Sequence, residues 1–130
     1  MGLDMFLASY DDWDEEKNDL KDDWNELLYW RKCNWLHKYF CDHGKSIQDD
    51  ILYIISREDL TKLLHNITSI LSAKNKVKVA KTKLPTQSGF FFGSTNYDEW
   101  YFEKLLSVLS EMSDLLLENK DNKFVYYASW

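Results

Sequence analysis

The stretch NELLYWRKCNWLHKYF, residues 25–40, decides how this chain folds, because its apolar and aromatic side chains recur on nearly every side. A helix that is apolar all round is buried among other elements. Gly44, four residues beyond the stretch, is suited to end such a helix. The pattern therefore predicts that residues 25–40 form the central helix of the fold.

Three short apolar runs outside this stretch predict strands. They are residues 3–7 (LDMFL), 51–55 (ILYII) and 124–130 (FVYYASW), which are rich in aromatic or branched side chains. Such residues fit the pleated, half-buried surface of a sheet. Since the first and last runs are short, apolar and otherwise unpaired, we expect both terminal strands to belong to the same small sheet.

Two amphipathic patterns predict further helices. Ser56 begins a capping-box sequence, and leucine and isoleucine then recur every three or four residues to about Ala73. A second apolar stripe follows the N-cap candidates Ser94, Thr95 and Asn96 and runs to Leu116.

The segment between these helices, residues 76–83, alternates Lys and Val, which predicts a linker or an edge strand. The chain is thus expected to be a single α+β domain over residues 1–130. About three helices should pack on a small, mostly antiparallel sheet that includes both terminal strands.

Length and composition are typical of one folded domain. The 130 residues are 45% hydrophobic and 16% aromatic, which is enough for a real core. No run approaches the length of a membrane span, and there is no apolar leader, so we expect a soluble cytoplasmic protein. The two cysteines, Cys33 and Cys41, suit a reducing compartment.

Charge is distributed unevenly along the chain, whose formal net charge is −6. Residues 11–23 hold eight acids and two lysines, whereas residues 74–83 hold five lysines and no acid. Both runs could simply be solvated surface. Alternatively, the acidic run attracts a basic partner or imitates a phosphate backbone, and the lysine run is a second contact patch. The acidic candidates for partner binding are Asp14, Glu15, Glu16 and Asp19.

The loop LPTQSGFFFGSTNYDEWYF, residues 84–102, places three adjacent phenylalanines between two glycines. Side chains alternate along a strand, so Phe90, Phe91 and Phe92 cannot all point inward. At least one of them should face a second apolar surface or a partner. All three are therefore candidates for partner binding.

A set of polar residues is the candidate ligand site. Arg31, Asn34 and His37 recur at spacing three, which would put them on one helix face beside aromatic side chains. Such a face suits an anion or a flat ring, and the loop could add further groups near a helix N-terminus. The added candidates are Gln87, Ser88, Ser94 and Asp98. Alternatively, these groups satisfy one another and cap the helix.

Metal binding is not expected, although Cys33, His37, Cys41 and His43 are all metal-ligand types. In a continuous helix Cys33 and Cys41 would lie about 12 Å apart. A zinc–sulfur bond is only about 2.3 Å long. No cofactor is expected either.

Three blocks resemble a family of small proteins encoded by bacteriophages and prophages. They are MGLDMFL (residues 1–7), YWRKCNWLHKYF (residues 29–40) and the 84–102 loop, followed by an aromatic YYASW tail. The family pattern reads MGLDMYL, YWRKAN-x-IHKWF and LPTQSGFFFGSTEYDEYYF, so Cys33 stands where the family has a small residue. The resemblance spans nearly the whole chain and implies phage origin and action in the cytoplasm of a bacterial host.

A phage protein of this size without a catalytic signature is typically an accessory factor. We expect an interaction or inhibitor protein that acts on a bacterial host protein, such as a defence system or CRISPR effector that itself binds nucleic acid. Direct binding to nucleic acid or membrane is not expected. The alternative is a small-molecule or nucleotide-binding module, either sequestering or enzymatic, that uses Arg31, Asn34 and His37. A component of replication or packaging machinery is a third possibility, and an enzyme is less favoured than a binding protein.

Overall fold

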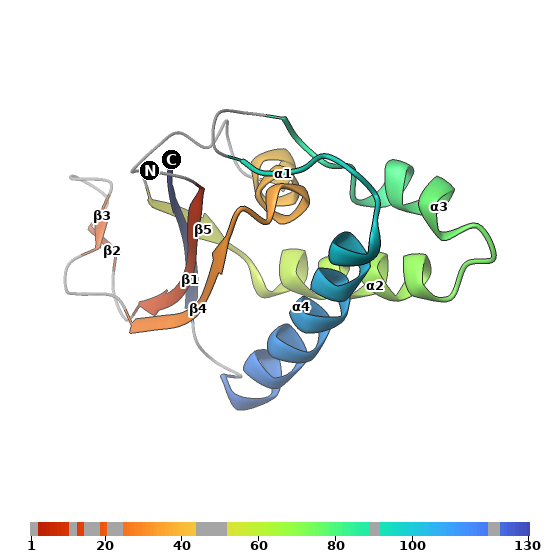
Figure 1. Cartoon of the computed structure of the whole chain (residues 1–130). Helices are drawn as coiled ribbons and strands as arrows, with labels where there is room; N and C mark the ends of the chain where they lie inside the picture. Colours follow the sequence, from red (N-terminus) through yellow and green to blue (C-terminus); the bar gives the residue numbers. More distant parts are fainter. Residues whose placement is uncertain are drawn as a thin grey trace.

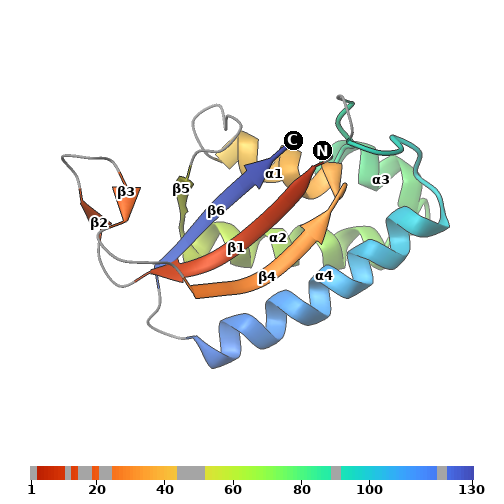
Figure 2. The same ribbon diagram turned by 60° about the vertical axis from the view of Figure 1, so that its left-hand side comes forward.

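In the part of the chain that the structure describes, a four-stranded antiparallel sheet carries four helices on one side (Figures 1 and 2). The computed structural model describes residues 3–10, 13–14, 19–20, 25–43, 52–88, 92–119 and 123–130. The strands of the sheet lie in the order β4 (Asn25–Arg31), β1 (Asp4–Tyr10), β6 (Lys123–Ser129) and β5 (Leu52–Ile55). The helices are α1 (Asn34–His43), α2 (Arg57–Leu71), α3 (Lys76–Lys83) and α4 (Glu99–Glu118). The α+β class is confirmed.

The two terminal strands are neighbours at the centre of the sheet. β1 pairs with β6 along its whole length, from Asp4 opposite Ser129 to Tyr10 opposite Lys123. β6 also pairs with β5, so it lies between two strands that are distant in sequence. The prediction that both ends of the chain share one sheet is confirmed.

The core fills the space between the sheet and the helices. Along β1 and β6, alternate side chains such as Met5, Leu7 and Tyr126 point to the helices and are fully buried. The helices contribute leucine, isoleucine, aromatic and methionine side chains from their inner faces, and all of these belong to one cluster. Its fully buried helical members include Leu36, Phe40, Leu60, Leu63, Ile67, Leu105, Val108 and Met112.

The predicted central helix is wrong in its first half. Residues 25–31 form β4, and the helix begins only at Asn34. In β4 the side chain of Trp30 is buried, whereas those of its neighbours Tyr29 and Arg31 are exposed, which is the period-two pattern of a strand. The chain turns between the two elements at Lys32, which has a positive φ of 55°. β1 supplies the pairing partner that makes this segment a strand.

Residues 76–83, expected to be a linker or an edge strand, form α3 instead. The Asn75 side chain accepts a hydrogen bond from the backbone N–H of Lys78 and caps this helix. The helix is short and mostly exposed, and its one fully buried side chain is Ala80. An Asn cap and one small buried contact thus outweigh the alternation of Lys and Val.

The acidic segment contains two paired strands, β2 (Trp13–Asp14) and β3 (Asp19–Leu20), which the sequence analysis did not predict. The cap of α4 is Asp98, not Ser94, Thr95 or Asn96: its carboxylate accepts from the N–H of Tyr101 at 3.1 Å. The cap of α2 is Ser56, as predicted.

Candidate functional site

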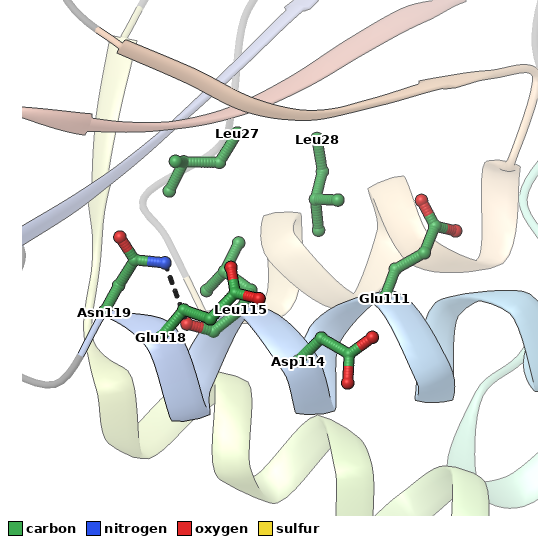
Figure 3. A pocket seen from close by; sticks show the side chains of 7 residues that line it. All are labelled: Leu27, Leu28, Glu111, Asp114, Leu115, Glu118 and Asn119. Carbon is green, nitrogen blue, oxygen red and sulfur yellow. Dashed lines mark hydrogen bonds between the residues drawn. The ribbon is translucent and has the colours of Figure 1, made fainter.

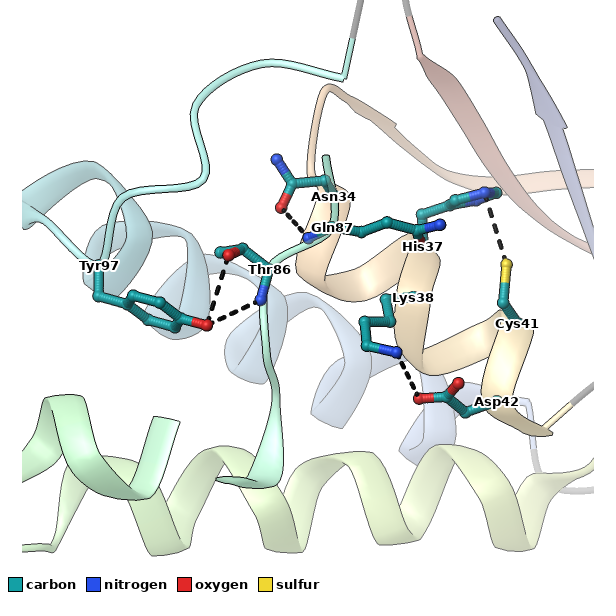
Figure 4. A network of polar contacts seen from close by, with 8 residues as sticks. All are labelled: Asn34, His37, Lys38, Cys41, Asp42, Thr86, Gln87 and Tyr97. Atoms are coloured by element: carbon teal, nitrogen blue, oxygen red, sulfur yellow. Dashed lines mark hydrogen bonds and ion pairs between the residues drawn. The ribbon is translucent and has the colours of Figure 1, made fainter. Parts of the chain in front are cut away.

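Asn34, at the first turn of α1, fastens the 84–98 loop to the fold (Figure 4). Its Nδ2 donates to the carbonyl oxygens of Phe92 at 3.1 Å and Ser94 at 2.8 Å. Its Oδ1 accepts from the backbone N–H of Gln87 at 3.2 Å. The side chain is almost fully buried and uses both ends of its amide. Asn34 thus binds the loop at two places, at Gln87 and at Phe92 and Ser94.

His37 lies one turn further along α1 and is 1% exposed. Its Nδ1 is hydrogen-bonded to the Tyr126 hydroxyl at 2.7 Å, and its Nε2 lies 3.5 Å from Cys41 Sγ. The ring packs edge-on against Phe92 and Trp130, with centroid distances of 5.3 and 5.1 Å. Burial lowers the His37 pKa to about 4, so the imidazole is neutral at pH 7.

Two further hydrogen bonds hold the loop in place beside this cluster. The Tyr101 hydroxyl donates to the Leu84 carbonyl at 2.7 Å, and the Thr86 N–H donates to the Tyr97 hydroxyl at 3.1 Å (Figure 4). Gln87 Oε1 is buried and has no hydrogen-bond partner among the described residues. The polar groups of the cluster therefore serve mainly to hold the loop against α1.

Arg31 does not belong to this cluster, which corrects the expected helical face of Arg31, Asn34 and His37. Arg31 ends β4, and its exposed side chain places Nε 3.8 Å from Asp4 Oδ1. The same carboxylate accepts from the Tyr29 hydroxyl at 2.6 Å, and this hydrogen bond raises the pKa of Tyr29. Arg31 therefore lies at a β1–β4 contact, because the segment is a strand here.

The other ligand candidates are only partly brought together. Gln87 and Ser94 meet Asn34 through backbone atoms, and the Ser94 hydroxyl accepts from the Asn96 N–H. Ser88 is exposed, and Asp98 is the exposed cap of α4.

Among the predicted partner-binding residues, Phe92 is buried in the core and is not available to a partner. Its ring is 5% exposed and packs against His37 and Trp130 in the core. Asp14 is paired in register with Asp19 in the β2–β3 ladder. Glu15, Glu16, Phe90 and Phe91 lie outside the described residues.

The residues considered as metal ligands do not gather into a site. Cys33 precedes α1 and is buried, and burial raises its thiol pKa to about 12. Within the described ranges, no group of three His, Cys, Asp or Glu side chains could hold one ion.

A groove between β4 and α4 is a second candidate site, which the sequence analysis missed. It has a volume of about 260 Å³. Leu28 pairs with Leu7 and Glu26 with Ala8, so Leu27 is an extra residue, a β-bulge, in β4. Bulges re-aim side chains. Figure 3 shows Leu27 and Leu28 both on the side of β4 that faces α4, where they line the groove with Leu115.

Three carboxylates form the opposite wall of the groove. Glu111, Asp114 and Glu118 lie on successive turns of α4, and none of them forms an ion pair within the described part of the chain (Figure 3). The helix ends here, and its last carbonyls add negative potential. Arg57 offsets part of this, donating to the carbonyl oxygens of Leu116 and Asn119.

The sequence alone gives only weak evidence for this groove. Acids at positions 111, 114 and 118 flank the apolar stripe of α4, but a solvated helix face has the same pattern. The groove exists because β4 is a strand with a bulge at Leu27, and the sequence did not predict this strand.

None of the helices that the structure describes is long and apolar enough to span a membrane. Comparison of the chain with protein-family models, with curated proteins and with solved structures gives no match.

Proposed function

We propose that this protein is a phage-encoded interaction protein that binds a bacterial host protein, with inhibition of a defence system, such as a CRISPR effector, as its role. The observation that carries the proposal is the groove between β4 and α4, which is lined by leucines and by three carboxylates without an ion pair among the described residues. Such a surface fits a basic protein better than an anionic ligand.

The acidic segment adds negative charge to the chain between two strands of the sheet. Residues 11–23 follow the end of β1 and precede β4, and Ser9 pairs with Asn25 at that end of the sheet. Leu27, two residues into β4, lines the groove. The connection between β1 and β4 thus carries eight acids in the sequence. Their combined field would speed association with a basic surface.

Effectors that bind nucleic acid carry basic surfaces, so they fit this charge pattern. The alternative, a module that binds a small molecule or nucleotide through Arg31, Asn34 and His37, has less support. Asn34 and His37 already hydrogen-bond within the fold, and Arg31 lies on a different element.

The test is plaque formation by a sensitive phage on hosts with and without a defined defence system. The wild-type protein should restore plaques on the defended host. The variant Glu111→Gln/Asp114→Asn/Glu118→Gln should keep its melting temperature and lose this effect. Glu103→Gln is the matched control, since this exposed acid lies on α4 about 16 Å from Asp114.

Binding to the purified effector should show the same order. Loss of the three charges should slow association, and the difference from wild type should shrink as salt rises. A protein that restores plaques on none of the defended hosts, or one that binds a nucleotide through Asn34 and His37, would contradict the proposal.

A further inference from the structure

We infer that the groove between β4 and α4 receives an arginine side chain from an extended basic segment of the partner. This inference rests on the proposed function and assigns the chemistry of the contact. It depends on three properties of the groove: its volume, its apolar floor and its charged wall.

The size and floor of the groove suit the stem of a long side chain. A volume of about 260 Å³ accommodates one large side chain but not a folded element. Apolar surface lies on both sides of the groove, from Leu27 and Leu28 on β4 and from Leu115 on α4. Arginine and lysine bury their methylene stems on such surfaces while the charged head stays near water.

The wall suits the head group of arginine. Along α4, Asp114 lies about 4.5 Å from Glu111 and about 6 Å from Glu118 in axial rise. A planar guanidinium has five N–H donors and can engage carboxylates in pairs, whereas an ammonium acts as a point charge. One guanidinium is already held at this end of α4, where Arg57 donates to the backbone carbonyls of Leu116 and Asn119.

The strand beside the groove favours an extended partner segment. Among the strands that the structure describes, β4 lies at the edge of the sheet and pairs only with β1. Edge strands present backbone groups to which another chain can add. A basic segment that runs along this edge would bring one of its side chains over Leu27 and Leu28.

The test uses the short peptide acetyl-Ser-Leu-Arg-Leu-Ser-amide as a probe, with matched peptides that carry lysine or the neutral isostere citrulline. Backbone amide shifts in NMR titrations of the full chain should change at Leu27, Leu28 and along Glu111–Asn119. The arginine peptide should bind about tenfold more tightly than the citrulline peptide and about threefold more tightly than the lysine peptide.

Variants locate the contact. Asp114→Asn/Glu118→Gln and Leu27→Ala should each weaken the arginine peptide about tenfold, whereas Glu103→Gln should leave its affinity unchanged. Equal binding of arginine and citrulline peptides, or shift changes outside the groove, would overturn the inference. Spermidine that binds as tightly as the arginine peptide would also overturn it, because the groove would then be a general polyamine site.

The two proposals fail separately. If plaque restoration depends on Glu111, Asp114 and Glu118 but the arginine peptide does not bind, only the arginine assignment is wrong. If the peptide binds as expected but no defended host is rescued, the assignment stands and the anti-defence role is wrong.

Discussion

At the scale of single residues, His37 shows how a chemically suggestive side chain is used for packing. Its imidazole bridges α1 to β6 through Tyr126 and contacts Cys41 on its own helix. Its ring fills the space between Phe92 and Trp130. Protonation would place a charge in this apolar surrounding, which is why its pKa is lowered.

The first prediction is that His37 makes the fold less stable at mildly acidic pH. Its pKa is about 4 in the folded protein, against 6.5 for an ordinary histidine. Above pH 6.5 both states are neutral, and as the pH falls from 6.5 to 4 only the unfolded chain takes up the proton. The free energy of unfolding should therefore fall by about 2 kcal/mol between pH 7 and pH 5 from this group.

Urea unfolding of the wild type and of His37→Gln at both pH values measures this. The variant should be less stable at pH 7 but should lose less stability on acidification. An equal loss in both proteins would mean that carboxylates, not His37, cause the pH dependence.

The second prediction concerns Gly93, which has a φ of 89°. A Cβ added there would lie 3.2 Å from the Cβ of Lys32, itself in a left-handed turn. Gly93→Ala should therefore lower the free energy of unfolding by about 1–2 kcal/mol. Ser88→Ala, on the exposed part of the same loop, is the control. Equal thermal midpoints for Gly93→Ala and wild type would show that the loop tolerates a side chain here.

At the scale of elements, the 84–98 loop is held to α1 by the side chain of Asn34. The carbonyls of Phe92 and Ser94 and the N–H of Gln87 all bond to it. These three hydrogen bonds join residues that are 53 to 60 positions apart in the chain.

The third prediction is that Asn34→Ala costs about 2 kcal/mol, because buried backbone groups lose their partners. Amide exchange at Gln87 should become faster, while exchange within α2 should change less. Asn34→Asp keeps the acceptor for Gln87 but loses the donor, so it should protect the Gln87 amide more than Asn34→Ala does. Unchanged exchange at Gln87 in both variants would remove Asn34 from this role.

At the scale of the whole molecule, β6 joins parts of the chain that are far apart in sequence. It pairs with β1 on one side and β5 on the other. It also buries Phe124, Tyr126 and Ala128 in the core.

The fourth prediction is that deletion of residues 124–130 unfolds the protein. The loss of several buried side chains, each worth about 3 kcal/mol or more, exceeds the total stability typical of a small domain. Circular dichroism should show no cooperative melt. A control chain lengthened by a short polar tail after Trp130 should melt normally, and a cooperative melt of the truncated chain would contradict the central position of β6.

Elements with strong local signals could be predicted from the sequence. α2 has a Ser cap and leucines at helical spacing, and both depend on residues within a few positions of one another. Residues 25–31 could not be predicted in this way, because an all-round apolar segment suits either a buried helix or a strand beside β1. The candidate site followed the same division: the sequence singled out Asn34 and His37 but did not predict that Phe92 and Tyr126 would be their partners.

By itself, the sequence determined the α+β class, the sharing of one sheet by the two ends, the helix after Ser56 and the acidic segment at residues 11–23. Only the tertiary structure decided that β4 is a strand, that Phe92 is buried and that Leu27 and Leu28 face the acids of α4. The physical reason is the range of the interactions. Capping and hydrophobic periodicity act between near neighbours, whereas strand pairing, burial and the groove depend on residues that folding brings together from distant parts of the chain.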